Sequence, residues 1–132
     1  EWLSITIDSF LNKYSNPLSI VDDEALKNVA NYIDDHYATS ISQDTLEKIS
    51  TMSGTKLKKL FKQKYQCTIT EYTQRRRMNM AELLLLNSTL KIQDIAEAVG
   101  YSSHSKFSTC FKKYKGFYPK DIKKYAKNNL SD

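Results

Sequence analysis

Glycine, proline and cysteine are scarce in this sequence, and their scarcity already narrows the fold class. The 132 residues include only 3 Gly and 2 Pro, the two residues that most often interrupt helices. Residues that favour helices, above all Leu and Lys, are frequent instead. We therefore predict an all-α fold, built as one domain or as two very small ones.

The sequence also lacks the residue patterns that enzymes and metal sites need. Cys67 and Cys110 stand alone, and with His36 and His104 they do not have the spacing of zinc ligands. A Ser/His/Asp set, a glycine-rich phosphate loop and a pair of carboxylates suited to acid–base catalysis are not apparent. We predict no enzymatic activity, no cofactor and no metal ion.

Long apolar runs are missing as well. No run approaches the roughly 18 residues of a membrane-spanning helix, and no signal-peptide pattern occurs. We predict a cytoplasmic protein with reduced cysteines and no membrane contact. Because the chain begins at Glu1 rather than at a methionine, we also expect that an upstream part is missing.

Positive charge is abundant but unevenly distributed, within a net charge of +5. Residues 1–40 carry seven acidic and two basic side chains, a net charge of −5. Residues 41–132 carry eight acidic and 18 basic side chains, a net charge of +10. A polyanion is the simplest partner for this second region, and a lysine-rich surface that contacts only solvent is the alternative.

The N-terminal segment has an apolar pattern of its own. Alternation near its start allows a strand, but helical spacing relates four of its apolar residues, Leu3, Ile7, Phe10 and Tyr14. The stretch Ser-Asn-Pro-Leu-Ser then breaks the pattern. We predict that residues 1–19 are a helix and linker left from an upstream regulatory region, through which a homodimer could form. Packing of the stripe on the same domain is the alternative.

The remainder, residues 20–132, is predicted to be one domain of helices, about seven in all. Asp22 or Asp23 is predicted to cap a helix that ends near His36. Later helices are predicted to be capped by Ser42, by Ser53 and by Ser102 or Ser103. Pro119 is predicted to open the last helix, which contains Ile122 and Tyr125.

One pattern occurs twice: a short helix, a turn and a longer basic helix. The sequence over 56–72 aligns with that over 106–122 at a shift of fifty. Upstream, Leu46 aligns with Ile95 at a shift of forty-nine, so the second turn is one residue longer. We call these repeats the first and second units; they span residues 42–66 and 92–115 and are joined by a helix predicted over 70–86.

Two helices joined by a tight turn can place the second one in the major groove of DNA. That helix needs an apolar inner stripe and an outer face of hydrogen-bonding or cationic side chains. In the second unit Gly100 suits the turn, and the stripe consists of Phe107, Cys110 and Phe111. The outer face is predicted to carry Ser103, His104, Lys106, Ser108 and Thr109, with Lys112 near phosphates.

The second unit and the residues after it resemble the signature of the AraC/XylS family of bacterial transcription regulators. The motif I-x-x-I-A-x-x-x-G-[YF], followed by S-x-F-x-x-x-F-K-x-x-x-G-x-x-P, is matched at Ile92, Ile95, Ala96, Gly100, Tyr101, Ser105, Phe107, Phe111, Lys112, Gly116 and Pro119. The first unit is similar to the family's first helix-turn-helix, and "RMNMAELLL" (77–85) to its linker helix. The resemblance covers about residues 22–127 and implies two helix-turn-helix subdomains that read successive major-groove segments.

This resemblance implies partners and contacts. Double-stranded DNA is the expected ligand, RNA polymerase an expected partner, and a missing upstream domain is expected to sense an effector. The first reading helix should use Thr55, Lys58 and Lys59 for bases, with Lys56 and Lys62 nearer phosphates. The second should use His104, Ser105, Lys106, Ser108 and Thr109. A surface histidine without a contact is the alternative for His104.

Several residues depart from the family's pattern or leave their role open. Thr51 and Gln66 stand where the family usually has glycine, and Glu47 stands where it has Ala. Burial of an unpaired carboxylate lowers the stability of the fold, so Glu47 should be partly exposed or paired. Arg77 is predicted either to contact phosphate or to join the two units by an internal ion pair.

The main rival interpretation is a helical protein-interaction module with a basic surface. It would explain the helices but not the doubled basic unit. A steep loss of DNA affinity with rising salt would distinguish a DNA-binding domain from such a module.

Overall fold

The structure is a computed structural model that describes residues 18–130. The described residues form seven helices and no strand, which confirms the all-α prediction. The helices are α2 (Ile20–His36), α3 (Gln43–Ser50), α4 (Gly54–Tyr65), α5 (Ile69–Asn87), α6 (Ile92–Ala98), α7 (His104–Lys115) and α8 (Pro119–Leu130). The apolar stripe predicted within residues 1–14 lies outside the described residues.

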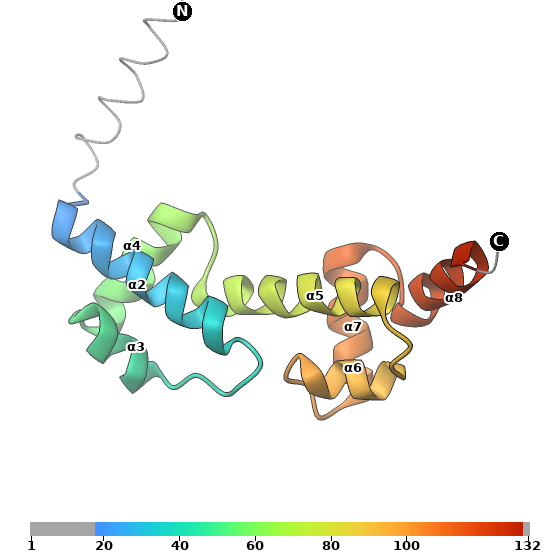
Figure 1. Cartoon of the computed structure of the whole chain (residues 1–132). Coiled ribbons are helices and arrows are strands. Elements are labelled where there is room, and N and C mark those ends of the chain that lie inside the picture. Colours follow the sequence, from blue (N-terminus) through green and yellow to red (C-terminus); the bar gives the residue numbers. More distant parts are fainter. Residues whose placement is uncertain (1–17, 131–132) are drawn as a thin grey trace, which may run out of the picture.

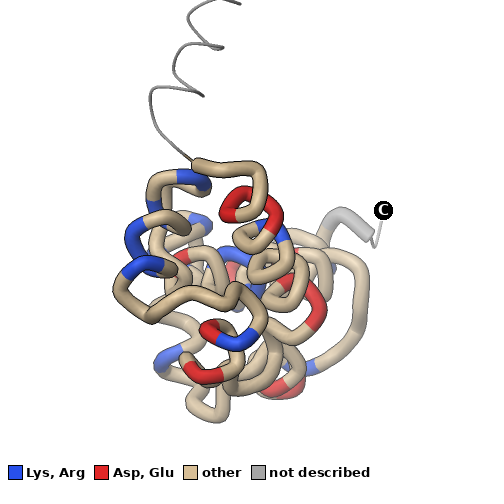
Figure 2. The backbone as a smooth tube through the Cα atoms, turned by 90° about the vertical axis from the view of Figure 1, so that its left-hand side faces the viewer, with Lys and Arg blue, Asp and Glu red and all other residues tan. Residues whose placement is uncertain are grey.

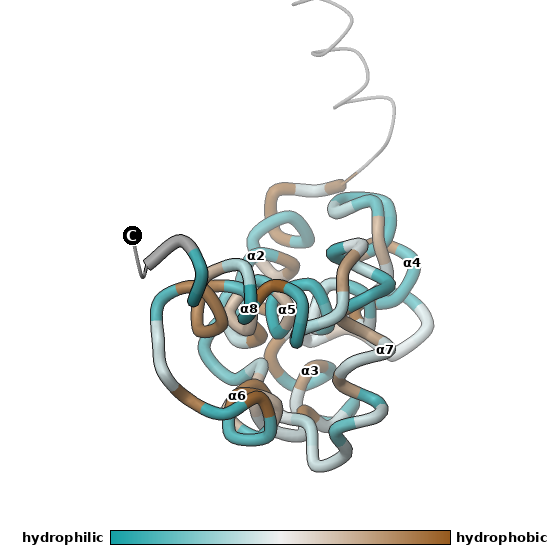
Figure 3. The backbone as a smooth tube through the Cα atoms, turned by 90° about the vertical axis from the view of Figure 1, so that its right-hand side faces the viewer, coloured by the Kyte–Doolittle hydropathy of each residue, from teal (hydrophilic) through white to brown (hydrophobic). Residues whose placement is uncertain are grey.

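The long helix α5 connects two groups of helices that lie at its two ends (Figure 1). Helices α2, α3 and α4 surround its beginning, and α6, α7 and α8 surround its end. The first unit therefore consists of α3 and α4, and the second of α6 and α7. In Figure 3 α4 is mostly teal, which shows how hydrophilic this helix is.

Each group of helices has its own core, and each core is assembled from one continuous stretch of sequence. The first core contains Leu26, Val29, Ala30, Ile33, Leu46, Met52, Leu57 and Phe61, with Tyr72 of α5 packed against it. The second contains Met78, Ala81, Leu85, Ile95, Ala96, Val99, Phe107 and Phe111. The boundary between the two cores thus falls between Tyr72 and Met78, in the first half of α5.

Serine and threonine side chains begin most of these helices. Ser42, Ser53 and Ser103 cap α3, α4 and α7 as predicted, and each Oγ accepts a hydrogen bond from a backbone N–H three residues on. Pro119 begins α8, as predicted. Tyr125 of that helix is exposed. Thr68 caps α5 and exchanges hydrogen bonds with Glu71, a capping box that we did not predict.

The predicted start of α2 was wrong. Ser19 is the N-cap, and its Oγ accepts a hydrogen bond from the N–H of Asp22 at 3.0 Å. Asp22 and Asp23 lie instead in the first turn. Carboxylates are favoured both as caps and in the first turn, where the helix dipole attracts them, so composition alone placed the cap too late.

The two units keep the same turn conformations with different residues. Thr51 and Gln66 have φ of 55° and 61°, while Gly100 and Gly116 have φ of 102° and 85°. All four lie in the left-handed region, which glycine adopts without steric cost. One residue separates Thr51 from the capping Ser53, whereas two separate Gly100 from Ser103, which confirms that the second turn is one residue longer.

Candidate nucleic-acid interface

Helix α4 buries one side and exposes the other. Leu57 and Phe61 are fully buried in the first core. At 100° per residue, Thr55 and Lys59 lie on the opposite side of the helix, with Lys58 and Lys62 beside them. All four are exposed, as expected for a face that contacts a partner.

Acidic residues of α2 neutralise one flank of α4 and leave the other positive. Lys64 Nζ lies 2.8 Å from Asp23 Oδ1, and Lys56 Nζ lies 3.6 Å from Asp22 Oδ1. The hydrogen bond from Lys64 is the main reason why the pKa of Asp23 is lowered. Figure 2 shows basic positions gathered along one side of this end of the molecule, with acidic positions beside them.

Three lysines of α4 stay free of such partners. Within residues 18–130, no carboxylate oxygen lies within 4.0 Å of the Nζ atoms of Lys58, Lys59 and Lys62. Lys56, which we predicted to approach phosphate, is on the flank that faces α2 and is paired there. The unpaired positive charge of the first unit is therefore concentrated on Lys58, Lys59 and Lys62.

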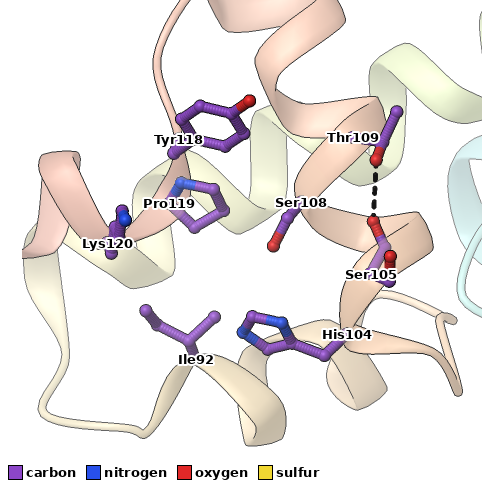
Figure 4. A pocket seen from close by; sticks show the side chains of 8 residues that line it. All are labelled: Ile92, His104, Ser105, Ser108, Thr109, Tyr118, Pro119 and Lys120. Atoms are coloured by element: carbon purple, nitrogen blue, oxygen red, sulfur yellow. Dashed lines mark hydrogen bonds between the residues drawn. The ribbon is translucent and has the colours of Figure 1, made fainter.

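Helix α7 also buries one side, but the chemistry of its exposed side differs from that of α4. Phe107 and Phe111 anchor it in the second core. Four predicted site residues, together with Ile92 of α6 and the start of α8, line a hollow of about 390 Å³ (Figure 4); they are His104, Ser105, Ser108 and Thr109. This face is rich in hydroxyl groups and carries an imidazole, so it offers both donors and acceptors of hydrogen bonds.

Some of these polar groups already have partners within the protein. Ser103 Oγ accepts the capping hydrogen bond from Lys106 N at 3.2 Å. Thr109 Oγ1 donates to Ser105 O at 2.9 Å, which leaves its lone pairs free to accept. Lys112 Nζ donates to Gly116 O at 2.9 Å and lies 5.2 Å from the centre of the Tyr118 ring.

Lys106 is separated from the other predicted contacts of α7. It is exposed, but it does not line the hollow of Figure 4. Two residues after His104, it projects about 200° further around the helix. Of the predicted residues, the structure brings together those at 104, 105, 108 and 109 and places Lys106 on the far flank.

The first unit has a hollow of the same construction. It measures about 580 Å³ and lies between α4 and the start of α5, lined by residues that include Gln43, Lys58, Lys59, Lys62, Thr68 and Thr70. A shift of fifty places Lys58 and Lys59 at the positions of Ser108 and Thr109, and Thr70 at that of Lys120. We had missed the contributions from the starts of α5 and α8, although the repeat extends over both and could have indicated them.

Arg77 lies between the two units and contacts both. Its Nε donates to Tyr37 O at 2.6 Å and its Nη2 to Thr39 O at 3.2 Å, both after the end of α2. Its Nη1 lies 3.5 Å from Gly100 O in the turn of the second unit, and its guanidinium is 5.3 Å from the ring centre of Tyr101. Arg77 therefore joins the units as predicted, but through carbonyl oxygens and a ring rather than through an ion pair.

Gly100 allows this close approach. A Cβ atom added to it would lie 2.8 Å from Ala38 O and 3.0 Å from Arg77 Cζ. Such distances are too short for a side chain, in addition to the φ of 102°. Glu47 is half-buried, consistent with the expectation that it would not be sealed in the core.

Other kinds of site find no support in the described residues. Over residues 18–130, no three His, Cys, Asp or Glu side chains gather as a metal site would require. None of the helices described is long and apolar enough to cross a membrane.

Comparisons with known proteins match this geometry. Residues 46–125 match a family model described as a helix-turn-helix domain. The Msm operon regulatory protein of Streptococcus mutans is 33% identical over 101 residues, which are 76% of this chain and 36% of that protein. The chain spans about a third of the length of the curated relatives it matches.

Two solved structures show how closely the fold corresponds. The C-terminal domain of AraT, a response regulator from Geobacillus stearothermophilus, is 28% identical with a TM-score of 0.72, over 82% of this chain and 87% of that one. The DNA-binding domain of AdpA, solved in complex with a target DNA, is 18% identical with a TM-score of 0.73, over 79% and 94% of the two chains. The second likeness, at this identity, concerns the fold alone.

Proposed function

Because the chain belongs to the AraC family of helix-turn-helix transcription regulators, we propose that it binds double-stranded DNA sequence-specifically, with α4 and α7 in successive major-groove segments. DNA-binding transcription regulators are not a class of enzymes. The observation that carries the proposal is the doubled reading helix, each copy anchored by two buried apolar residues and flanked by a similar hollow.

The length of α5 supports binding on one face of the DNA. Its 19 residues extend over about 28 Å at 1.5 Å per residue. Successive major-groove segments on one face lie about 34 Å apart. The length of α5 is therefore close to the distance between these segments. The diameters of the two reading helices at its ends add to the separation between them.

The site residues divide into two groups in this proposal. Base edges are contacted by Thr55, Lys58, Lys59, His104, Ser105, Lys106, Ser108 and Thr109. Phosphates are contacted by Lys56, Lys62, Ser103 and Lys112. The exposed face of α7 supports the base contacts, since hydroxyl and imidazole groups discriminate base edges, and Lys58 and Lys59 can donate to guanine from the exposed face of α4. The unpaired ammonium group of Lys62 supports a phosphate contact.

The remaining proposals concern the whole protein. We propose that a region upstream of this chain senses an effector and that residues 1–19 are its remnant, with residues 20–132 forming the DNA-binding domain. RNA polymerase is the proposed protein partner, and a homodimer would form through the N-terminal or missing region. The protein would act in the cytoplasm, where bacterial DNA is found.

Selection of binding sites from random duplex DNA, followed by fluorescence anisotropy over a range of salt concentrations, tests the function. We expect an enriched site with two half-sites about one turn apart and an affinity that falls steeply with salt. An absence of any enriched duplex, or binding that salt does not weaken, would favour the protein-interaction module instead.

A further inference from the structure

Continuity of α5 does not by itself fix how the two units face each other. The cores they pack around are separate, and the boundary falls near Arg77. In the part of the chain that the structure describes, no other side chain hydrogen bonds both to the loop after α2 and to the turn of the second unit. Arg77 therefore adds a direct link between the two units to the one that α5 provides.

Arg77 is suited to holding an orientation. A guanidinium has five N–H donors in a rigid planar fork, so carbonyls in fixed directions can all be satisfied only from one position. The carbonyls of Tyr37, Thr39 and Gly100 belong to a helix end, a loop and a turn, where α-helical hydrogen bonds are not available to them. The fork therefore connects the loop after α2 with the turn of the second unit.

We propose that Arg77 is a positioning residue that sets which spacing between two DNA half-sites the protein accepts. This inference rests on the function proposed above. When two linked units are held rigidly, binding of one places the other at a high effective concentration over a site at the matching distance only. An inserted base pair moves the second half-site by about 3.4 Å and turns it by about 34°. A rigid pair of units cannot follow that movement, whereas a loosened pair can.

The first experiment compares the 132-residue parent with Arg77→Met and Arg77→Lys on selected duplexes. Each duplex is made at the selected spacing, with one base pair inserted or deleted, and as a single half-site. We expect the parent to lose about tenfold or more in affinity on insertion or deletion. Arg77→Met should bind the selected spacing about tenfold more weakly, keep the affinity for half-sites, and lose only about twofold on insertion.

Two controls accompany these variants. Arg75→Met is the same substitution on the exposed side of the same helix, and it should leave the spacing penalty of the parent intact. Arg77→Lys keeps the charge but not the fork, and it should give an intermediate penalty. An Arg77→Met variant that shows the full spacing penalty of the parent would overturn the inference.

The second experiment needs no DNA, so it separates this inference from the proposed function. Residual dipolar couplings of the backbone amides in α4 and α7 report whether the two units share one alignment tensor. We expect a common tensor for the parent and for Arg75→Met, and two different tensors for Arg77→Met. If Arg77→Met retains a common tensor, or if the parent already needs two, the positioning role is wrong, whether or not the chain binds DNA. If Arg77→Met does not fold, Arg77→Lys serves both experiments.

Discussion

The two units share a backbone design and differ in the chemistry they present. The first has Lys58, Lys59 and an unpaired Lys62 on its outer face, whereas the second has Ser108 and Thr109 at the first two of these positions. Lys112, at the third, is held by Gly116 O. Attraction to phosphate acts on every sequence, while directed hydrogen bonds discriminate between bases. The difference suggests that the first unit mainly provides affinity and the second mainly provides selectivity.

The start of the reading helix shows the same contrast. Gly54 occupies the position of His104, and a Cβ atom there would lie 2.8 Å from Glu47 Oε1. The first unit therefore packs its reading helix closely against α3 and has no side chain at this point. The second unit has an exposed imidazole there, beside Ile92 and Pro119 (Figure 4). The same backbone position is thus a packed glycine in the first unit and an exposed side chain that can contact a partner in the second.

The largest expected effects come from removing the aromatic anchor of either core. Phe61 and Phe111 are equivalent and fully buried, so Phe61→Ala and Phe111→Ala should each destabilise the chain by roughly 3–5 kcal/mol. Thermal melting measures the total loss, and amide exchange in α4 and α7 shows which unit opens. We expect each variant to expose mainly its own unit, because the cores are separate. Equal loss of protection in both units would show that the two cores unfold together.

Gly100→Ala should lower the stability of the fold more than Gly116→Ala, although both glycines have positive φ. An alanine in the left-handed region costs roughly 1–2 kcal/mol at either site. Gly116 has open space around it, whereas Gly100 faces Ala38 O and Arg77, so a further loss of about 1 kcal/mol is expected only at Gly100. Chemical denaturation of both variants measures the difference. Equal losses would mean that the junction between the units accommodates a methyl group.

His104→Ala and Lys62→Ala should separate selectivity from affinity. His104→Ala should reduce the preference for the selected site over random duplex by about 1 kcal/mol, at the low end of what base contacts provide. Lys62→Ala should weaken binding to all duplexes and reduce the slope of log K against log salt by about 0.9. Titrations at several salt concentrations give both quantities. Identical behaviour of the two variants would show that the reading face has been assigned incorrectly.

A comparison of Lys62→Ala with Lys112→Ala sharpens this point. The two lysines are equivalent, but Lys112 donates to Gly116 O and lies over Tyr118, while Lys62 has no carboxylate partner in the described residues. We therefore expect Lys112→Ala to change the salt slope by less than the roughly 0.9 expected for Lys62→Ala. A larger change for Lys112→Ala would mean that DNA displaces the internal hydrogen bond and recruits the ammonium group.

The smallest effect should be a gain. Gln66 has a φ of 61°, so Gln66→Gly removes a strain of about 1–2 kcal/mol but adds backbone entropy in the unfolded chain. A net stabilisation of about 0.5 kcal/mol is expected, with Gly116→Gln as the reverse control. Denaturation midpoints of both variants check this. A destabilised Gln66→Gly would show that the hydrogen bond from its Nε2 to Gln63 O matters more than the strain.

Much of the fold could be predicted because local signals dominate it. The doubled pattern, the serine caps and the apolar stripes each depend on residues a few positions apart. The start of α2 could not be located from composition, since Ser19, Asp22 and Asp23 all suit a helix start.

The site was predictable in part. Helical phase placed His104, Ser108 and Thr109 on the outer face, the family resemblance added Ser105, and all four line one hollow in the structure. The partners of Lys56 and Arg77 could not be foreseen, because they depend on which distant segments meet. The carbonyl groups that bind Arg77 belong to the backbone, so no residue type in the sequence reveals them.

The arrangement of each core from one continuous stretch of sequence has a consequence for how the protein is made. Residues up to about 72 contain everything that the first core needs, so this half can fold on the ribosome while the second is still being translated. Most contacts among the described residues join positions close in sequence, which favours rapid folding. The second half then folds onto an α5 whose beginning is already anchored. The core of the first unit can therefore be complete before the residues of the second core have been synthesised.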